Sequence, residues 1–350
     1  MKLFNSIKTV FSNIKTIVII KIAEFNSKES VINGKKAVLN SIRTVFNSIK
    51  TAFNSIKAVI SKQKADDNHL PLSLLWQHKI QLVLCLIFAV SAICFAVAVI
   101  SQARDSKALK EQQQMLQQDM NTATESEENQ TDGTSDENSA EESSPAILAE
   151  YNVLYQQNSD FTGWLKIDDT LVDYPVMQCL EDENYYLQHD FYRADNIYGC
   201  LVLDNDSHAG NGTKQQDYAD GTKPSTNLIV HGHMTKTGEM FGNLNLYRDK
   251  EYGLSHSIIY FDTLYEKREY QLISAFYSQV YYQNDDVFKY YKFFQADTQE
   301  EFDYWYDNIK QKSLYDTGVT AEFGDEFITL SCCSYHMTDG RFVVVAKRIK

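Results

Sequence analysis

The pattern of apolar and polar positions divides the chain into four parts. In residues 1–64 apolar side chains recur every three or four positions, most regularly at Leu39, Ile42, Phe46, Ile49, Phe53, Ile56 and Ile60. Residues 80–100 are almost entirely apolar, residues 101–145 are mostly polar, and after residue 146 short apolar stretches alternate with polar turns. The pattern predicts an amphipathic helical segment, a long apolar helix, a polar connection and a strand-rich globular domain.

The repeats of residues 1–64 place a wide apolar face beside a row of cations. Phe-Asn-Ser-Ile-Lys begins at Phe46 and returns at Phe53, and Arg43, Lys50 and Lys57 follow one edge of the apolar face. A coiled coil would need opposite charges at the flanking positions, and this segment has no anionic complement. An apolar face edged by lysines favours the surface of an anionic membrane. A coiled coil and a repeat expansion without function remain the alternatives.

Residues 80–100 form the predicted transmembrane helix. These 21 residues carry no charged side chain. At 1.5 Å per residue they span about 30 Å, which matches the hydrocarbon core of a bilayer. A signal peptide would have a shorter apolar region closer to the N-terminus. We therefore expect a single membrane span at this position.

The net charge of −14 conceals an asymmetry that predicts the orientation of this span. Residues 1–64 carry 12 Lys and Arg against 2 Asp and Glu, whereas residues 65–145 and 146–350 have net charges of −9 and −15. Cations are enriched on the cytoplasmic side of membrane spans. We therefore expect a single-pass protein of the cell membrane, with a cytoplasmic N-terminus and an extracellular C-terminal domain.

Residues 101–145 are predicted to be an acidic, disordered tether. The preceding helix is able to extend outward for a few turns through residues 107–118. From residue 121 to residue 144 the chain is rich in Glu, Ser, Asp, Asn and Thr and has no aromatic side chain. Such a segment cannot bury enough apolar surface to offset the loss of chain entropy on folding.

Residues 146–350 have the pattern of one β-rich domain. Strands are predicted at 163–167, 171–176, 200–203, 227–230, 257–261, 269–277, 327–331 and 341–347. A helix is predicted at 147–157. Eight strands with few helices indicate a barrel or a sandwich. The length is ample for a single hydrophobic core.

Three residues with matched chemistry lie at the ends of predicted strands. Cys333 ends one strand, Arg341 begins the next, and His233 follows the apolar stretch 227–230. A thiolate is a nucleophile that needs a base or a cationic partner, which His233 can supply. Arg341 is a permanent cation that can hold an anionic oxygen. A Cys and a His often occur in one chain by chance, so the pattern by itself indicates only a thiol acyl transferase or peptidase.

The motifs around these residues resemble those of the sortase family. Thr329-Leu330-Ser331-Cys332-Cys333 is similar to the Thr-Leu-Ser-Thr-Cys signature of sortases, and Arg341 is followed by valines as the family's arginine is. His231-Gly232-His233 resembles the family's Tyr-Gly-His element. Similarity to the class B branch extends over residues 146–350, at 163–167, 173–176, 184–187, 199–204 and 240–244, and includes a helical stretch at 298–313.

The resemblance implies both a fold and an activity. The expected fold is mostly β, an eight-stranded sortase-type β-barrel with an N-terminal helix and an extra helix before the last two strands. The expected activity is that of a membrane-anchored cysteine transpeptidase of a Gram-positive bacterium. Cys333 would attack a carbonyl in the sorting signal of a surface protein or pilin, LPxTG-like or NPxTN-like, and form a thioacyl intermediate. No cofactor, metal or nucleic acid is expected.

The resemblance also implies roles for the other two residues and an acceptor. His233 would protonate the leaving amine and later deprotonate the incoming amine. Arg341 would donate to the oxyanion or to the substrate backbone near it. The expected acceptor is an amine of peptidoglycan or of a pilin subunit.

Two positions depart from the family pattern. Cys332 and His231 stand where the family usually has threonine and tyrosine. Together with Ser331 they are predicted to contribute to substrate binding. Because side chains alternate along a strand, only one of the two adjacent thiols can face His233, and the family register assigns this place to Cys333. A vicinal disulfide between the two thiols would silence the enzyme.

Other interpretations of these residues remain open. His231, His233, Cys333 and His336 together would suit zinc, but catalysis explains the same side chains and no carboxylate is evident to orient the histidines. Cys179 and Cys200 either pair or stay free, since spacing does not decide between the two. The runner-up function is a membrane-anchored cysteine peptidase that releases its products to water, followed by an inactive binding module.

Overall fold

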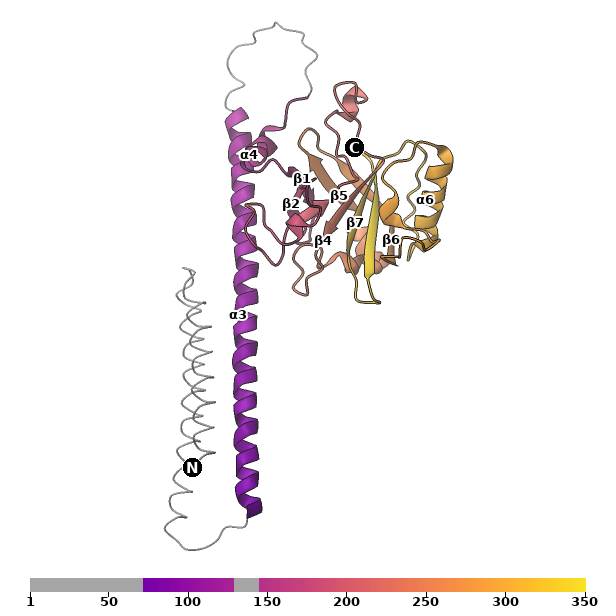
Figure 1. Cartoon of the computed structure of the whole chain (residues 1–350). Helices are drawn as coiled ribbons and strands as arrows, with labels where there is room; N and C mark the ends of the chain where they lie inside the picture. The colour runs from indigo at the N-terminus through magenta and orange to yellow at the C-terminus, as the bar shows by residue number, and fades with distance from the viewer. Residues whose placement is uncertain (1–71, 129–144) are drawn as a thin grey trace. The chain divides into compact units, whose positions relative to one another are not determined.

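A computed structural model describes residues 72–128 and 145–350 of the chain (Figure 1). Its helices are α3 (Leu72–Glu128), α4 (Ala149–Gln157), α5 (Lys250–Ser255) and α6 (Gln299–Lys312). Its strands are β1 (Phe161–Lys166), β2 (Asp173–Met177), β3 (Leu201–Leu203), β4 (Asn227–Gly232), β5 (Ile258–Thr263), β6 (Glu269–Gln279), β7 (Phe327–Cys333) and β8 (Gly340–Arg348). The repeats of residues 1–64 and the acidic stretch 129–144 lie outside the described residues.

The eight strands close into one barrel, as the family resemblance implies. Their order around the barrel is β1-β2-β3-β4-β7-β8-β6-β5. Strand β2 is parallel to β3, and β4 is parallel to β7, while the other neighbours are antiparallel. Strand β7 therefore has β4 on one side and β8 on the other. The three strands that carry the candidate catalytic residues are direct neighbours.

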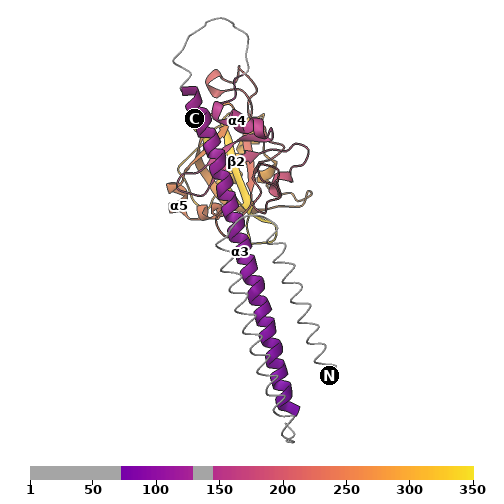
Figure 2. The same ribbon diagram turned by 90° about the vertical axis from the view of Figure 1, so that its left-hand side faces the viewer.

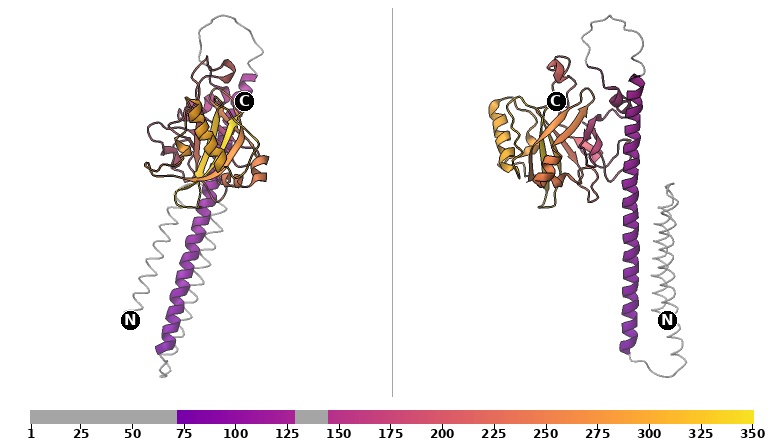
Figure 3. Two further views of the ribbon diagram at one scale, coloured as in Figure 1. Left: turned by 90° about the vertical axis from the view of Figure 1, so that its right-hand side faces the viewer. Right: turned by 180° about the vertical axis from the view of Figure 1, so that it is seen from behind.

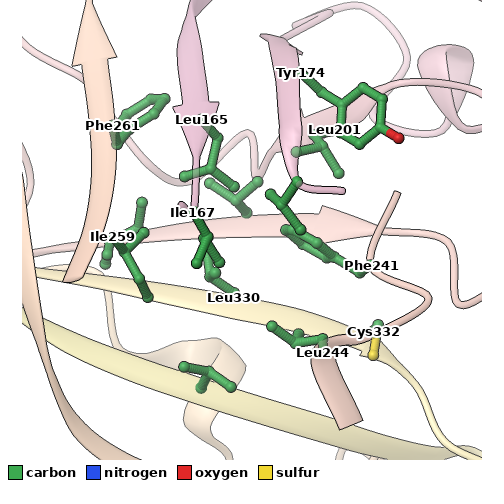
Figure 4. Close-up of a cluster of buried hydrophobic side chains, with 14 of the residues drawn as sticks. Leu165, Ile167, Tyr174, Leu201, Phe241, Leu244, Ile259, Phe261, Leu330 and Cys332 are labelled. Atoms are coloured by element: carbon green, nitrogen blue, oxygen red, sulfur yellow. The ribbon is translucent and has the colours of Figure 1, made fainter. Parts of the chain in front are cut away.

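Alternating side chains fill the interior of the barrel. In β7 the inward side chains are Ile328, Leu330 and Cys332, which belong to the same buried cluster as Phe241. Figure 4 shows this cluster, in which Leu330 and Cys332 lie on one strand and Phe241 packs nearby. Strand residues that point inward are separated by two positions, as the pleat of a strand requires. The same alternation sends the intervening residues of β7 to the outer surface of the barrel.

Helix α6 covers part of that outer surface. Its buried side chains Phe302, Trp305 and Ile309 are spaced by three and four residues, so they form one face of the helix. They pack with the outward side chains of β6, β7 and β8, including Phe327 and Val345. Figure 3 (left) views the barrel from this side, with α6 in front of the sheet. Strand β8 is apolar at successive positions because both of its faces are buried.

A capping box marks the start of α6. Thr298 is the N-cap, and its hydroxyl accepts a hydrogen bond from the backbone N–H of Glu301. The backbone N–H of Thr298 in turn donates to the Glu301 carboxylate, which completes a capping box. The observed helix agrees with the predicted stretch 298–313.

The chain divides into two compact units between Ala103 and Arg104. From Arg104 onward, α3 belongs to the unit of the barrel and runs in front of β2 in Figure 2. Leu109 and Leu116 are buried there, and the amides of Gln113 and Gln117 donate to Asp173. Helix α3 thus includes the predicted extension at 107–118 and continues to Glu128, into the stretch 121–144 that was predicted to be disordered. The few apolar residues of this part of α3 stand among many glutamines, so the composition does not reveal the helix face that packs on the barrel.

The predicted membrane span overlaps the first half of α3. Among the residues that the structure describes, no helix is long and apolar enough to cross a bilayer. The span at residues 80–100 stays a prediction from the sequence.

A buried ionic cluster lies at the start of β7 and the end of β8. Arg348 pairs with Glu266 at 2.7 Å and with Glu326 at 2.8 Å. Arg268 pairs with Glu266 at 3.0 Å, and both arginines are almost fully buried. Cys333 stands at the other end of β7, so the cluster stabilises the barrel away from the candidate site.

Candidate active site

Cys333 is the last residue of β7 and its side chain is exposed. The preceding residue, Cys332, points into the barrel and is 2% exposed. The two thiols differ because adjacent side chains of a strand leave on opposite faces. Burial raises the pKa of the Cys332 thiol to about 12, with the nearby Cys333 thiol adding to the rise and Arg341 opposing it. Cys332 is therefore a protonated core side chain at neutral pH.

Arg341 lies directly across from Cys333 on the neighbouring strand. The antiparallel register of β7 and β8 pairs these two residues. Arg341 Nη1 donates to the carbonyl oxygens of Asp339 at 3.3 Å and Gly340 at 3.1 Å. Within the described ranges 72–128 and 145–350, its guanidinium forms no ion pair with a carboxylate. The remaining N–H groups are available to an acceptor from outside the protein.

His233 follows β4 on the other side of Cys333. The parallel register of β4 and β7 pairs Gly232 with Cys332, so the next residues along the two strands are His233 and Cys333. His233 Nε2 lies 2.7 Å from the carbonyl oxygen of Leu187. A carbonyl only accepts, so Nε2 carries the hydrogen and Nδ1 is the ring's available acceptor. The bond to Leu187 fixes one side of the imidazole.

These three side chains share one face of the sheet. Gly232, Cys332 and Phe342 are inward or core positions, so their neighbours His233, Cys333 and Arg341 belong to the outer face. Adjacent strands are about 5 Å apart, which is within reach of these side chains. The sheet thus aligns an imidazole, a thiol and a guanidinium in that order. Such a row can hold a nucleophile between an acid–base group and an oxyanion donor.

His231 lies on the same outer face, two residues before His233. Its Nε2 is 3.0 Å from Oδ2 of Asp204, which follows strand β3. Burial by itself raises the pKa of Asp204, but the hydrogen bond from His231 and the backbone N–H of Asp206 bring it below the usual range. The side chain of His231 is 32% exposed. It is thus held in place and still partly open to a ligand.

The structure buries Ser331 and Cys332, two of the residues predicted to bind substrate. Ser331 is 1% exposed, and a hydrogen bond of 2.6 Å links its hydroxyl to that of Tyr290. Tyr290 precedes α6 and is itself buried against Phe276. Both Ser331 and Cys332 are therefore buried side chains. Of the three residues predicted for substrate binding, only His231 is accessible.

The turn between β7 and β8 sets the spacing of Cys333 and Arg341. The N–H of Ser334 donates to the carbonyl of Gly340 at 2.8 Å, which closes the turn. A Cβ at Gly340 would collide with that region, against the carbonyl oxygen of Ser334 and the ring of His336. His336 also packs on Tyr277, with ring centroids 4.7 Å apart. We therefore assign His336 to the support of this turn.

The structure also describes the other cysteines and the side chains that were considered for a zinc site. Cys179, Cys200, Cys332 and Cys333 are all free. In the part of the chain that the structure describes, no group of three or more His, Cys, Asp or Glu side chains is placed to hold a metal ion.

Sequence reasoning missed several partners of the site. The carbonyl of Leu187 is a backbone group, so no residue type marks it. Asp204 lies in the quoted motif 199–204, but its link to His231 depends on the pairing of β3 with β4. Tyr290 lies outside every motif and reaches Ser331 only through the long connection after β6. Of these three partners, only Asp204 could have been found from a predicted strand order.

Comparisons with known proteins agree with this arrangement. No protein-family model matches the chain. The chain is 29% identical over 205 residues to sortase B of Listeria monocytogenes, which covers 58% of this chain and 75% of that protein. It is 28% identical over 213 residues to sortase B of Staphylococcus aureus, at 58% and 76% coverage.

Solved structures give the same family. A Staphylococcus aureus sortase B–substrate complex matches with a TM-score of 0.55 and 26% identity, covering 71% of this chain and 99% of that one. Sortase B from B. anthracis matches with a TM-score of 0.51 and 27% identity, at 69% and 98% coverage. Sortase B complexed with triglycine matches with a TM-score of 0.53 and 25% identity, at 70% and 99% coverage. These similarities support membership of the class B sortase family and indicate a cysteine transpeptidase of the sortase B type.

Proposed function

We propose that Cys333, His233 and Arg341 form the catalytic centre of this transpeptidase. The observation that carries the proposal is their position at the ends of three adjacent strands, on one outer face, with the exposed thiol in the middle. The buried Cys332 offers no competing nucleophile, because its thiol faces the core. The resemblance of Thr329–Cys333 to the family signature supports the same assignment.

In the proposed first step, His233 accepts the proton of the Cys333 thiol, and the sulfur forms a bond to the carbonyl carbon of the scissile peptide bond. The C–N bond then breaks, and His233 gives a proton to the leaving amine. The product is a thioester between the substrate and Cys333. Arg341 donates hydrogen bonds to the carbonyl oxygen as negative charge develops on it, or to the adjacent substrate backbone.

In the proposed second step, an amine takes the place of water. Its nitrogen attacks the thioester carbon, a proton passes from the amine to His233, and the C–S bond breaks. His233 passes this proton to the sulfur, so the thiol is restored, and a new peptide bond links the substrate to the acceptor. In each step His233 accepts one proton and gives one up, first to the leaving amine and later to the sulfur, so its protonation state is restored.

We propose that the substrate is a sorting-signal peptide, LPxTG-like or NPxTN-like, of a surface protein or pilin. The acceptor is an amine of peptidoglycan or of a pilin subunit. The similarity to a sortase B–substrate complex and to sortase B complexed with triglycine supports a peptide donor and a peptide amine. His231 is the accessible neighbour of the centre, so we assign it to contact with the substrate.

We also propose that the enzyme is anchored in the cell membrane by residues 80–100, with residues 1–64 in the cytoplasm and the barrel outside. The support is the uncharged 21-residue stretch and the excess of cations before it. Phe95, Val97 and Val99, near the end of this stretch, are exposed apolar side chains, as contact with lipid requires. The cationic repeats suit an anionic inner membrane surface.

The test uses the full chain with sorting peptides of both kinds, with and without triglycine as amine acceptor. We expect a ligated product that appears only when the amine is present. Release of free acid at the same rate with or without amine would favour the alternative, a membrane-anchored cysteine peptidase. No turnover of either peptide kind would contradict the proposed function.

A further inference from the structure

The loop that follows His233 closes on itself around Glu239. The backbone N–H of Phe241 donates to the carbonyl of His233 at 3.0 Å, and Met234 and Met240 form an isolated β-bridge. The hydroxyl of Thr235 donates to the carbonyl of Glu239 at 2.8 Å. The backbone that carries the imidazole is therefore tied to Glu239 and to the two residues after it.

The Glu239 carboxylate is buried and is held by hydroxyl groups. It is 3% exposed, and Oε1 accepts a hydrogen bond of 2.5 Å from Oγ of Ser106. Oε2 accepts a longer bond of 3.3 Å from Thr235. Burial by itself raises the pKa of Glu239, but the bonds from Ser106 and Thr237 bring it below the usual range. No Lys, Arg or His among residues 72–128 and 145–350 forms an ion pair with it.

Ser106 comes from helix α3, far from this loop in sequence. It belongs to the helix face formed by Ser106, Leu109, Gln113, Leu116 and Met120, whose spacing alternates between three and four residues. Leu109 packs in the core cluster that contains Met240 and Phe241. Leu116 packs in a second cluster, and Gln113 donates to the carbonyl of Asp173 at 2.5 Å. This face of α3 is thus seated on the barrel at several points.

We infer that Ser106 is a positioning residue for His233. The section of α3 from Arg104 onward thereby helps to hold the proposed catalytic site in place. Ser106 satisfies one oxygen of a buried carboxylate that has no cationic partner in the described part of the chain. Without that bond the carboxylate must turn toward other donors, and the loop it holds together moves with it. Because the loop starts at His233, the shift reaches the imidazole. The inference rests on the proposed role of His233.

The experiment compares Ser106→Ala, Ser106→Thr and Ser126→Ala in the full chain, held in lipid nanodiscs. Ser126 is the matched control, since it is an exposed serine of the same helix whose hydroxyl donates to the carbonyl of Thr122. Two quantities are measured: kcat and KM with a sorting peptide and triglycine, and the ring signals of His233 by NMR with labelled histidine. His233→Ala identifies the His233 signals by their loss.

For Ser106→Ala we expect kcat to fall about 5- to 50-fold with KM within about twofold, as a displaced catalytic group produces. The His233 signals should shift or broaden, while circular dichroism shows the same folded fraction. Ser106→Thr keeps the hydroxyl and should restore both readouts, and Ser126→Ala should change neither. Ser106→Ala combined with Glu239→Gln should be no worse than the more impaired single variant, since both act through one contact.

Unshifted His233 signals in folded Ser106→Ala would overturn the inference, whatever happens to kcat. A loss of kcat matched by an equal loss of folded protein, with unshifted signals, would also overturn it, because it would show a structural role only. Failure of the proposed function looks different: His233→Ala would then retain turnover. In that case the NMR signals of His233 still test whether Ser106 positions this residue.

Discussion

At the scale of single residues, the site depends on which face of a strand each side chain leaves. Cys332 and Cys333 are adjacent and chemically equal, yet one packs in the core and the other is exposed. The alternation that buries Cys332 also brings His233 and Arg341 to the face of Cys333. The strand register therefore favours Cys333 as the proposed nucleophile.

Arg341 tests whether directed hydrogen bonds or charge alone assists the thiol. Arg341→Lys keeps the positive charge but loses the planar group that can grip two acceptors. We expect kcat/KM to fall on the order of 10²-fold, close to the value of Arg341→Ala, because oxyanion donors act through geometry. Recovery of most activity in the lysine variant would show that Arg341 acts mainly as a charge.

The three histidines near Cys333 are expected to separate clearly. His233→Ala should lose kcat on the order of 10²-fold or more, because the leaving amine then has no proton donor. His231→Ala should keep most of its kcat, and its main change should be in KM, since His231 is proposed to contact the substrate. His336→Ala should fold and retain most turnover. A folded His231→Ala variant as inactive as His233→Ala would remove the assignment of His233.

At the scale of elements, the strongest sequence patterns gave the closest agreement. The predicted strand 341–347 corresponds to β8 (Gly340–Arg348), and the predicted helix 298–313 corresponds to α6 (Gln299–Lys312). Long apolar runs are local signals that can be located without knowing the partners, whereas the helix at 298–313 was expected from the resemblance to class B sortases. The strand ends carry Cys333 and Arg341, which is why the row of catalytic candidates was predictable as well.

The elements and contacts that the sequence did not predict depend on distant partners. Helix α3 beyond Arg104 is polar enough to suggest a tether, and only the barrel surface makes Leu109 and Leu116 buried residues. The bond from Ser106 to Glu239 joins residues 133 positions apart. Ser331 was predicted to bind substrate because of its motif. In the structure its hydroxyl is hydrogen-bonded to Tyr290, which lies in the connection between β6 and α6.

The ionic cluster between β8 and the turn after β5 should make stability depend on acidity. Burial raises the pKa of Glu266, but the hydrogen bond and charge of Arg348 outweigh it and leave the pKa below the ordinary 4.5. A lowered pKa stabilises the fold above the unfolded value, and that contribution is lost as pH falls through the folded value. We expect the free energy of unfolding in urea to decrease below about pH 4.5.

Glu266→Gln isolates this contribution. The variant should lose about 1–3 kcal/mol of stability at pH 7 and should depend less on pH below that range, because the titrating group is absent. An acid dependence equal to that of the unaltered chain would show that other carboxylates are responsible. Cys333 lies at the other end of β7, so turnover of the folded fraction should not change.

At the scale of the whole molecule, the charge asymmetry makes a prediction about topology. If residues 80–100 cross the membrane with the N-terminus inside, protease added to intact protoplasts should remove the barrel and spare residues 1–64. The fragments can be followed with antibodies to tags at the two ends of the chain. Protection of the C-terminal tag in intact protoplasts, with cleavage after lysis, would reverse the proposed orientation.

The proposed mechanism depends on one thiol of the 350-residue chain carrying the substrate. The most direct measurement is mass spectrometry of the full chain mixed with a sorting peptide in the absence of an amine, followed by fragment mapping of the adduct. We predict an acyl group on Cys333, no adduct in Cys333→Ala, and an unchanged adduct in Cys332→Ala and Cys332→Thr. An acyl group on Cys332, or an adduct that survives in Cys333→Ala, would contradict the proposed mechanism.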